Sequence, residues 1–315
     1  MIDAYCHVGL PRFGTAEEAL TIADLYSIQK SVLVLGPMVP DFGTLIQAMQ
    51  QYKDRIRGVG IPFGNTPEQQ IESTEILLHA GVTAMRLQGP EMLPEILNRV
   101  GEAGRWIYAI GLRSGGRIAQ TNLDWLEKYP NSKIMAPHFL SSDVSKIEGA
   151  LTELLQHPHF FPIFSRHGGL GSQEPYPHND LKPWVERTIE LAGYNRMMWG
   201  SECPVLYWRN ENMPNCQNWL NELLGNENLN GFLGTNAQRE IFDTPPPKSE
   251  TVALPNWIEE TFDRTRTIPA FDYGGLELPM DVYEKLHHRY VSQLEQNNPL
   301  TFAEFVVDVL KETVA

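Results

Sequence analysis

Three side chains that can bind metal or move protons alternate within the first seven residues of the chain, MIDAYCH. They are Asp3, Tyr5 and His7. Residues two positions apart in a β-strand point to the same face, so a strand here would present all three groups at one end. Cys6 would point to the opposite face, where we expect it to serve packing.

Polar side chains also end four later apolar runs. Arg86 stands in MRLQ, His138 in MAPHFL, Arg166 and His167 in SRHGG, and Glu202 in GSECP. If these runs are parallel strands of a barrel, their carboxyl ends meet at one mouth. A carboxylate there can hold a divalent ion or accept a proton, and imidazoles can polarise a carbonyl. The spacing therefore predicts one site assembled from several strands.

Eight short apolar runs alternate with helix-like stretches, and most runs are continuous, as in strands buried on both faces of a parallel sheet. The expected helices include 15–28, which opens with a Thr15–Glu18 capping box, 66–79 and 181–192. No GxGxxG spacing follows the first run, which disfavours an open nucleotide-binding sheet. The pattern predicts a TIM (β/α)8 barrel. The predicted strands are 1–9, 31–37, 55–63, 81–88, 106–112, 133–140, 160–165 and 197–202.

The composition changes after Phe242. Residues 243–249 contain three consecutive prolines, which suit a linker rather than a helix or a sheet. Two helices are expected beyond it, at 281–296 and 302–314, and the second carries an amphipathic stripe. We therefore divide the chain into a barrel at 1–242 and a C-terminal helical appendage at 243–315, which would pack on the barrel or join a homo-oligomer.

Several segments together resemble the amidohydrolase-related branch of the amidohydrolase superfamily, which includes decarboxylases and lactonases. The resemblance covers residues 1–242 and not the tail. It implies that His7 is a metal ligand and that His138 is a metal ligand or a group that polarises the substrate. It also implies that Glu202, in place of the usual aspartate, binds metal and shuttles a proton. Tyr5 replaces the first histidine of the family's Asp-x-His-x-His pattern. The segments that carry the resemblance are MIDAYCHVG, GVTAMRLQ, MAPHFL, YNRMMWGSECPV and LGTNAQREIF.

The altered motif leaves two interpretations of the site open. In one, His7, His138 and Glu202 hold one divalent ion, most simply zinc, with water in the open position. In the other, the site works without metal. There the histidines polarise a carbonyl, Tyr5 donates to an oxyanion, and Glu202 activates water. A small, anionic substrate would then be bound by Arg86, Arg113, Arg166 and His167.

Three functions remain in competition. The first is a hydrolase for an ester, lactone or amide, with Glu202, His138 and Tyr5 as catalytic residues. The second is a decarboxylase of the same fold, and the third is an inactive barrel used for binding or assembly.

The composition limits the kinds of binding partner that we expect. A net charge of −14 over 315 residues argues against nucleic acid and against an anionic membrane surface. We expect neither a membrane span, because no run of 18 apolar residues is present, nor a signal peptide. Three cysteines are too few for a disulfide framework, so we expect a cytoplasmic protein.

Overall fold

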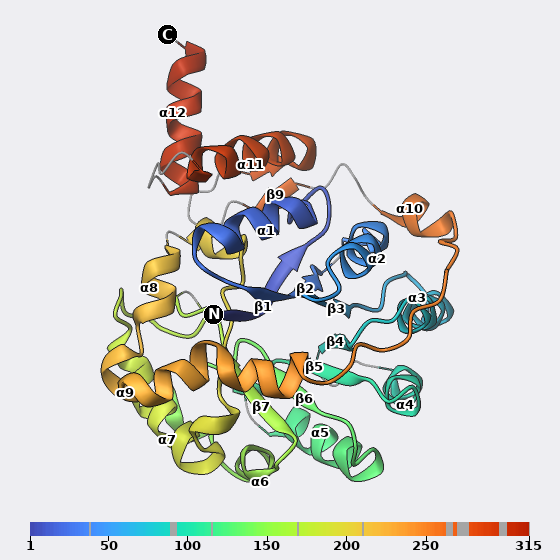
Figure 1. Cartoon of the computed structure of the whole chain (residues 1–315), viewed down its shortest axis with the longest axis vertical. Coiled ribbons are helices and arrows are strands. Elements are labelled where there is room, and N and C mark those ends of the chain that lie inside the picture. The colour runs from blue at the N-terminus through green and yellow to red at the C-terminus, as the bar shows by residue number, and fades with distance from the viewer. Residues whose placement is uncertain are drawn as a thin grey trace.

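A single ring of eight parallel strands organises the molecule (Figure 1). The computed structural model describes residues 1–37, 39–88, 93–114, 116–168, 170–209, 211–262, 267–269, 277–295 and 301–314. Each strand pairs with the next along the chain, as in a TIM barrel. The strands are β1 (Ile2–Val8), β2 (Lys30–Leu35), β3 (Ile56–Gly60), β4 (Ala84–Gln88), β5 (Trp106–Ile110), β6 (Ile134–Ala136), β7 (Phe160–Phe164) and β8 (Met198–Trp199).

Helices cover the outside of the ring, and the predicted alternation of strands and helices is confirmed. The capping box of Thr15 and Glu18 opens α1 as expected. The helices of the barrel are α1 (Ala16–Leu25), α2 (Phe42–Gln51), α3 (Pro67–His79), α4 (Pro94–Glu102), α5 (Arg117–Lys128), α6 (Ala150–Gln156), α7 (Lys182–Ala192), α8 (Met213–Asn218) and α9 (Asn221–Asn230).

The ring closes between β1 and β8 through two backbone hydrogen bonds. Glu202 donates from its N–H to the carbonyl of Tyr5 at 2.8 Å, and His7 donates to the carbonyl of Cys203 at 2.7 Å. Both bonds lie beyond the last residue of β8. The backbone that closes the barrel is therefore the same backbone that carries Tyr5, His7 and Glu202.

The first strand contains a bulge that changes which face Asp3 occupies. Asp3 pairs with Ser31 and Cys6 pairs with Leu33, so the register with β2 shifts between them. Ser31 and Leu33 share one face of β2, which means that Asp3 and Cys6 also share a face. The prediction that Asp3 points the same way as His7 was wrong, because the bulge breaks the alternation. The prediction that Cys6 faces away from His7 is confirmed.

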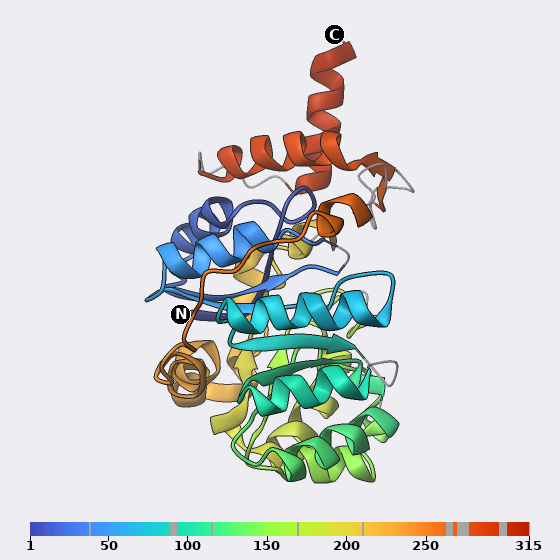
Figure 2. The same ribbon diagram turned by 90° about the vertical axis from the view of Figure 1, so that its right-hand side faces the viewer.

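The tail leaves the barrel as a strap along α3 and returns over α1 (Figure 2). Glu250 bonds the backbone of His79, and the indole of Trp257 donates to Glu72 at 2.9 Å. The strap includes α10 (Trp257–Thr261). A short antiparallel pair, β9 (Thr267–Pro269) and β10 (Glu277–Pro279), then leads into two helices.

The two predicted tail helices are present as α11 (Met280–Glu295) and α12 (Phe302–Val314). Residue 296, which was expected to end the first, lies outside the described residues. Tyr283 of α11 packs on Trp208 and Tyr290 packs on Tyr207, with ring centroids 5.3 and 5.5 Å apart. The appendage therefore packs on its own barrel, while the boundary at residue 242 stays a prediction. None of the helices described is both long and apolar enough to cross a membrane.

Candidate active site

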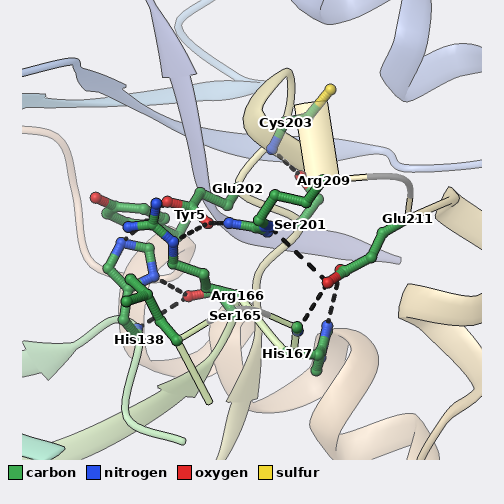
Figure 3. Close-up of polar contacts among 12 residues, drawn as sticks. Tyr5, His138, Ser165, Arg166, His167, Ser201, Glu202, Cys203, Arg209 and Glu211 are labelled. Carbon is green, nitrogen blue, oxygen red and sulfur yellow. Dashed lines mark hydrogen bonds and ion pairs between the residues drawn. The ribbon is translucent and has the colours of Figure 1, made fainter. Parts of the chain in front are cut away.

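A buried glutamate forms the centre of the polar groups at the barrel mouth (Figure 3). The side chain of Glu202 is only 3% exposed. One carboxylate oxygen, Oε1, lies 3.3 Å from Nε2 of His138. The other, Oε2, pairs closely with Nη1 of Arg209 and lies 3.6 Å from Nε of Arg166. Both oxygens of the carboxylate therefore have cationic or donor partners.

These partners keep Glu202 ionised. Burial alone would raise the pKa of its carboxyl, because the low-dielectric interior disfavours a charge. The opposite charges of Arg209 and Arg166, with His138, outweigh that effect and hold the pKa of Glu202 well below its usual range. The site thus keeps a fixed negative charge between two guanidinium groups.

The ring of His138 is oriented by a serine. Oγ of Ser165 accepts from the backbone N–H of His138 and lies 3.0 Å from its Nδ1, so the hydroxyl can donate to that nitrogen. Nε2 faces a carboxylate and must then carry the ring proton. Burial lowers the pKa of His138 well below its usual value. His138 is therefore a neutral imidazole whose Nε2 lies 3.3 Å from Oε1 of Glu202.

His7 and Tyr5 lie beside this pair. Nδ1 of His7 donates to the carbonyl of Val34 at 3.2 Å, and burial lowers the pKa of His7 to about 3. The phenol oxygen of Tyr5 accepts from Nε of Arg86 at 3.0 Å. The Tyr5 ring meets His7 and His138 edge-on, with centroids 5.0 and 4.9 Å apart. The convergence expected from the strand ends is thus present for these groups.

Two further arginines, Arg113 and Arg166, occupy the rim, while Arg209 lies deeper. Arg166 follows β7 and its side chain is 23% exposed, whereas that of Arg209 is 8% exposed. Arg113 follows β5 and donates to the carbonyl of Leu170. Burial lowers its pKa, and its charge interacts with those of Arg166 and Glu202. The rim is therefore cationic in a protein that is acidic as a whole.

His167 lies apart from this group, although it follows Arg166 directly. Its buried ring packs between His178 and Trp219, and its Nδ1 lies 3.7 Å from Glu211 (Figure 3). The structure does not bring His167 to Tyr5 or His138. Its predicted role in substrate binding stays a prediction without geometric support.

Asp3 ties the two edge strands together from behind the site. Its carboxylate accepts from the backbone N–H groups of Tyr5 and Ser201, at 3.0 and 2.9 Å, and from the hydroxyl of Ser201. Burial raises the pKa of Asp3 to about 6 despite these bonds. Asp3 therefore ties Ser201, the residue before Glu202, to Tyr5 of β1 rather than facing the mouth.

Sequence reasoning missed three residues of this site: Ser165, Arg209 and Glu211. Arg209 follows Glu202 by seven residues, on the short 3-10 helix at Val205–Arg209. Its position one short helix after the last strand was the available signal. Without the fold, nothing in the sequence shows that this helix turns Arg209 back towards Glu202.

The predicted metal ligands do not fit a divalent ion in this arrangement. Both ring nitrogens of His138 are engaged by Ser165 and Glu202, and both oxygens of Glu202 are engaged by His138 and the two arginines. A cation here would also face nearby guanidinium charges. Within the described part of the chain, no group of three His, Cys, Asp or Glu side chains could hold a metal ion. The expected set of His7, His138 and Glu202 is therefore not assembled.

Comparisons with known proteins agree with this architecture. A putative 2-pyrone-4,6-dicarboxylic acid hydrolase from Pseudomonas putida superposes with a TM-score of 0.55 at 18% identity, over 76% of this chain and 96% of that one. An amidohydrolase from Burkholderia multivorans with bound zinc superposes with a TM-score of 0.57 at 13% identity, over 76% and 97%. A protein from Agrobacterium tumefaciens gives 0.56 at 17% identity, over 78% and 96%.

No curated protein sequence matches the chain. The sequence model of a protein family, described as amidohydrolase, matches residues 44–240. This match spans more than half of the chain and ends where the strap begins. With the eight-stranded ring and its polar mouth, it shows that the chain is an enzyme of the amidohydrolase family.

Proposed function

We propose that this enzyme hydrolyses an ester or lactone that carries a carboxylate. One observation supports this most strongly. A buried, ionised Glu202 is oriented by His138 and lies beside arginines on a cationic rim. Such a site can hold a water molecule on its carboxylate and an anionic substrate on its guanidinium groups.

Each residue has a distinct part in the proposed reaction. Water bonds to Glu202 and attacks the carbonyl carbon while its proton passes to the carboxylate. The carbonyl oxygen gains negative charge and accepts from the hydroxyl of Tyr5. Because Arg86 donates to the same phenol oxygen, it stabilises negative charge that develops there. The tetrahedral intermediate then collapses with cleavage of the ester C–O bond, and Glu202 returns the proton to the leaving oxygen. Arg113 and Arg166 bind the substrate carboxylate.

The two arginines at Glu202 differ in how freely they can serve the substrate. Arg209 is almost fully buried, whereas Arg166 is partly exposed and its Nε lies 3.6 Å from Oε2. A substrate carboxylate can therefore draw Arg166 to itself without disturbing Arg209. Loss of one cationic neighbour makes Glu202 a stronger base at the moment when substrate is bound.

Hydrolysis suits this site better than decarboxylation. Guanidinium groups stabilise a carboxylate in the ground state, and that stabilisation opposes its loss as carbon dioxide. The same groups assist hydrolysis when they bind a carboxylate remote from the reacting carbonyl. We also propose that the reaction needs no metal, because the nitrogens of His138 and the oxygens of Glu202 already have protein partners.

A substrate panel tests the proposal. Carboxylated lactones and aryl esters, starting with 2-pyrone-4,6-dicarboxylic acid, are assayed with chelator-treated enzyme beside their neutral methyl esters. We expect ring opening or ester cleavage of the anions at least about tenfold faster than of the neutral analogues, since each charge-assisted contact contributes about 1.5–3 kcal/mol.

Two results would contradict the proposal. One is release of carbon dioxide without hydrolysis, and the other is equal rates on anionic and neutral esters. Glu202→Gln should abolish turnover. Glu190→Gln, on the exposed side of α7, is the matched control and should leave it unchanged.

A further inference from the structure

Behind Glu202 lies a buried chain of charged side chains that the proposed reaction does not use. Arg209 pairs through Nη1 with Glu202, and its Nε lies 3.8 Å from Oε1 of Glu211. Glu211 accepts from the backbone N–H of Gly168 at 2.7 Å and lies 3.7 Å from His167. Figure 3 shows Arg209 between the two carboxylates.

Burying these charged side chains costs free energy, and packing alone does not explain why the protein keeps them. Taking an arginine and two glutamates out of water is expensive, and such groups are often replaced by apolar residues without loss of stability. The side chains of Arg209 and Glu211 are 8% and 13% exposed. Holding one carboxylate in a fixed orientation at the reacting centre is a role that apolar residues could not fill.

The geometry at Glu202 shows which part of its side chain needs a fixed orientation. The carboxylate presents Oε1 to His138 at 3.3 Å, while Oε2 meets Arg209 and lies 3.6 Å from Arg166. The backbone of Glu202 is left-handed, with φ 56°, so the turn aims the side chain at the mouth but does not set the rotation of the carboxylate about its last bond. Arg209 contacts Oε2 and not Oε1, so this contact can set the rotation of the carboxylate about its last bond.

We propose that Arg209 is a positioning residue for Glu202 and that Glu211, fixed by Gly168 and His167, holds Arg209 in place. This inference rests on the proposed function, because it assigns Arg209 to the orientation of the catalytic carboxylate. The proposal gives the two arginines of the site different roles. Arg209 orients the enzyme's own carboxylate, and Arg166 meets the substrate's. It also gives His167 a place in the support of the site, away from the substrate.

Three variants test the assignment on an ester or lactone that the wild-type enzyme hydrolyses. Arg209→Gln should lower kcat by about a hundredfold with little change in KM, because a misplaced reacting group costs about that much. Arg209→Lys keeps the charge but loses the fork that spans two carboxylates, so kcat should be partly restored. Glu211→Gln should lower kcat by about tenfold. Arg187→Gln, at an exposed ion pair, is the control and should match the wild type.

Crystal structures of the same variants give a readout that needs no substrate. In Arg209→Gln, the Glu202 carboxylate should rotate away from its 3.3 Å approach to His138. A variant that keeps this approach, or one that raises KM while leaving kcat intact, would overturn the proposal. If Arg209→Gln does not fold, Glu211→Gln and Arg209→Lys decide by the same measures. If the wild type hydrolyses nothing, the proposed function fails, and the position of the carboxylate still decides the role of Arg209.

Discussion

Three of the residues at the mouth share an unusual backbone. His138, Arg166 and Glu202 have φ values of 57°, 59° and 56°, and none is a glycine. Side chains rarely tolerate this left-handed region, and such residues gather where a site demands them. Each of the three follows the end of its strand, so the turn aims the side chain across the barrel mouth.

Tyr5 tests the proposed stabilisation of the oxyanion. Tyr5→Phe removes the hydroxyl but keeps the ring that packs between His7 and His138. We expect kcat to fall by about a hundredfold, as for the loss of one donor to an oxyanion, with unchanged folding. Steady-state kinetics on the anionic ester check this. Full activity in Tyr5→Phe would remove Tyr5 from the mechanism.

Asp3 should make stability depend on pH. Its pKa rises from the ordinary 3.8 to about 6 in the folded protein, so the native state keeps a proton that the unfolded chain has released. The stabilisation is complete below pH 3.8 and is lost as the pH rises to about 6. The full difference is about 3 kcal/mol.

The comparison with Asp3→Asn isolates this effect, because asparagine does not titrate. Urea unfolding from pH 4 to pH 7 should show the wild type losing stability relative to the variant as the pH rises. A difference between the two proteins that stays constant across this range would show that Asp3 does not hold a proton in the native state.

At the scale of elements, the sequence predicted most of the architecture and little of the site's connections. Continuous apolar runs identified all eight strands, because both faces of a barrel strand are buried. The bounds were less accurate. The run 133–140 contains β6 only at Ile134–Ala136, because the left-handed turn at His138 ends the strand early. The bulge between Asp3 and Cys6 could not be predicted either, because the residues on both faces of the first strand are compatible with a regular β-strand.

The pairing of Glu202 with Arg209 could not be predicted either. It depends on how one short helix turns after β8, and the sequence does not encode that angle in any local pattern. Arg86, His138 and Glu202 were predictable because strand ends in a barrel share one mouth whatever their loops do.

The contact between the appendage and the barrel predicts that the two parts unfold together. Phe302 of α12 is buried against Tyr283 and Tyr290 of α11, which in turn pack on the helix that carries Arg209. Phe302→Ala should cost about 3 kcal/mol and lower the unfolding temperature of the whole chain. Val307→Ala, at a side chain that is 48% exposed, is the control. A separate early transition for the tail, with an unchanged barrel, would show that the two unfold independently.

At the scale of the whole molecule, the C-terminal appendage packs over the first helix of the barrel. α11 lies against α1, and α12 projects away from the barrel (Figures 1 and 2). Val307, Leu310 and Val314 of α12 are exposed. The expectation of a homo-oligomer through the C-terminal helices stays a prediction, and these three residues are its natural contact.

Sedimentation velocity of the full chain and of Leu310→Glu tests that expectation. If the exposed stripe joins two copies, the wild type should sediment as an oligomer and the variant as a monomer, since a buried charge would oppose association. A wild type that is monomeric at all concentrations, or an oligomer that Leu310→Glu leaves intact, would refute an interface at this stripe.

The most direct test of the account is the rate at which chelator-treated enzyme opens a carboxylated lactone, measured side by side for the wild type and for Glu202→Gln. The account predicts steady turnover by the wild type without added metal and no detectable turnover by the variant. A wild type that is active only after a divalent metal is restored, or a Glu202→Gln enzyme that keeps its rate, would contradict the assignment of this carboxylate and its arginines as the catalytic centre.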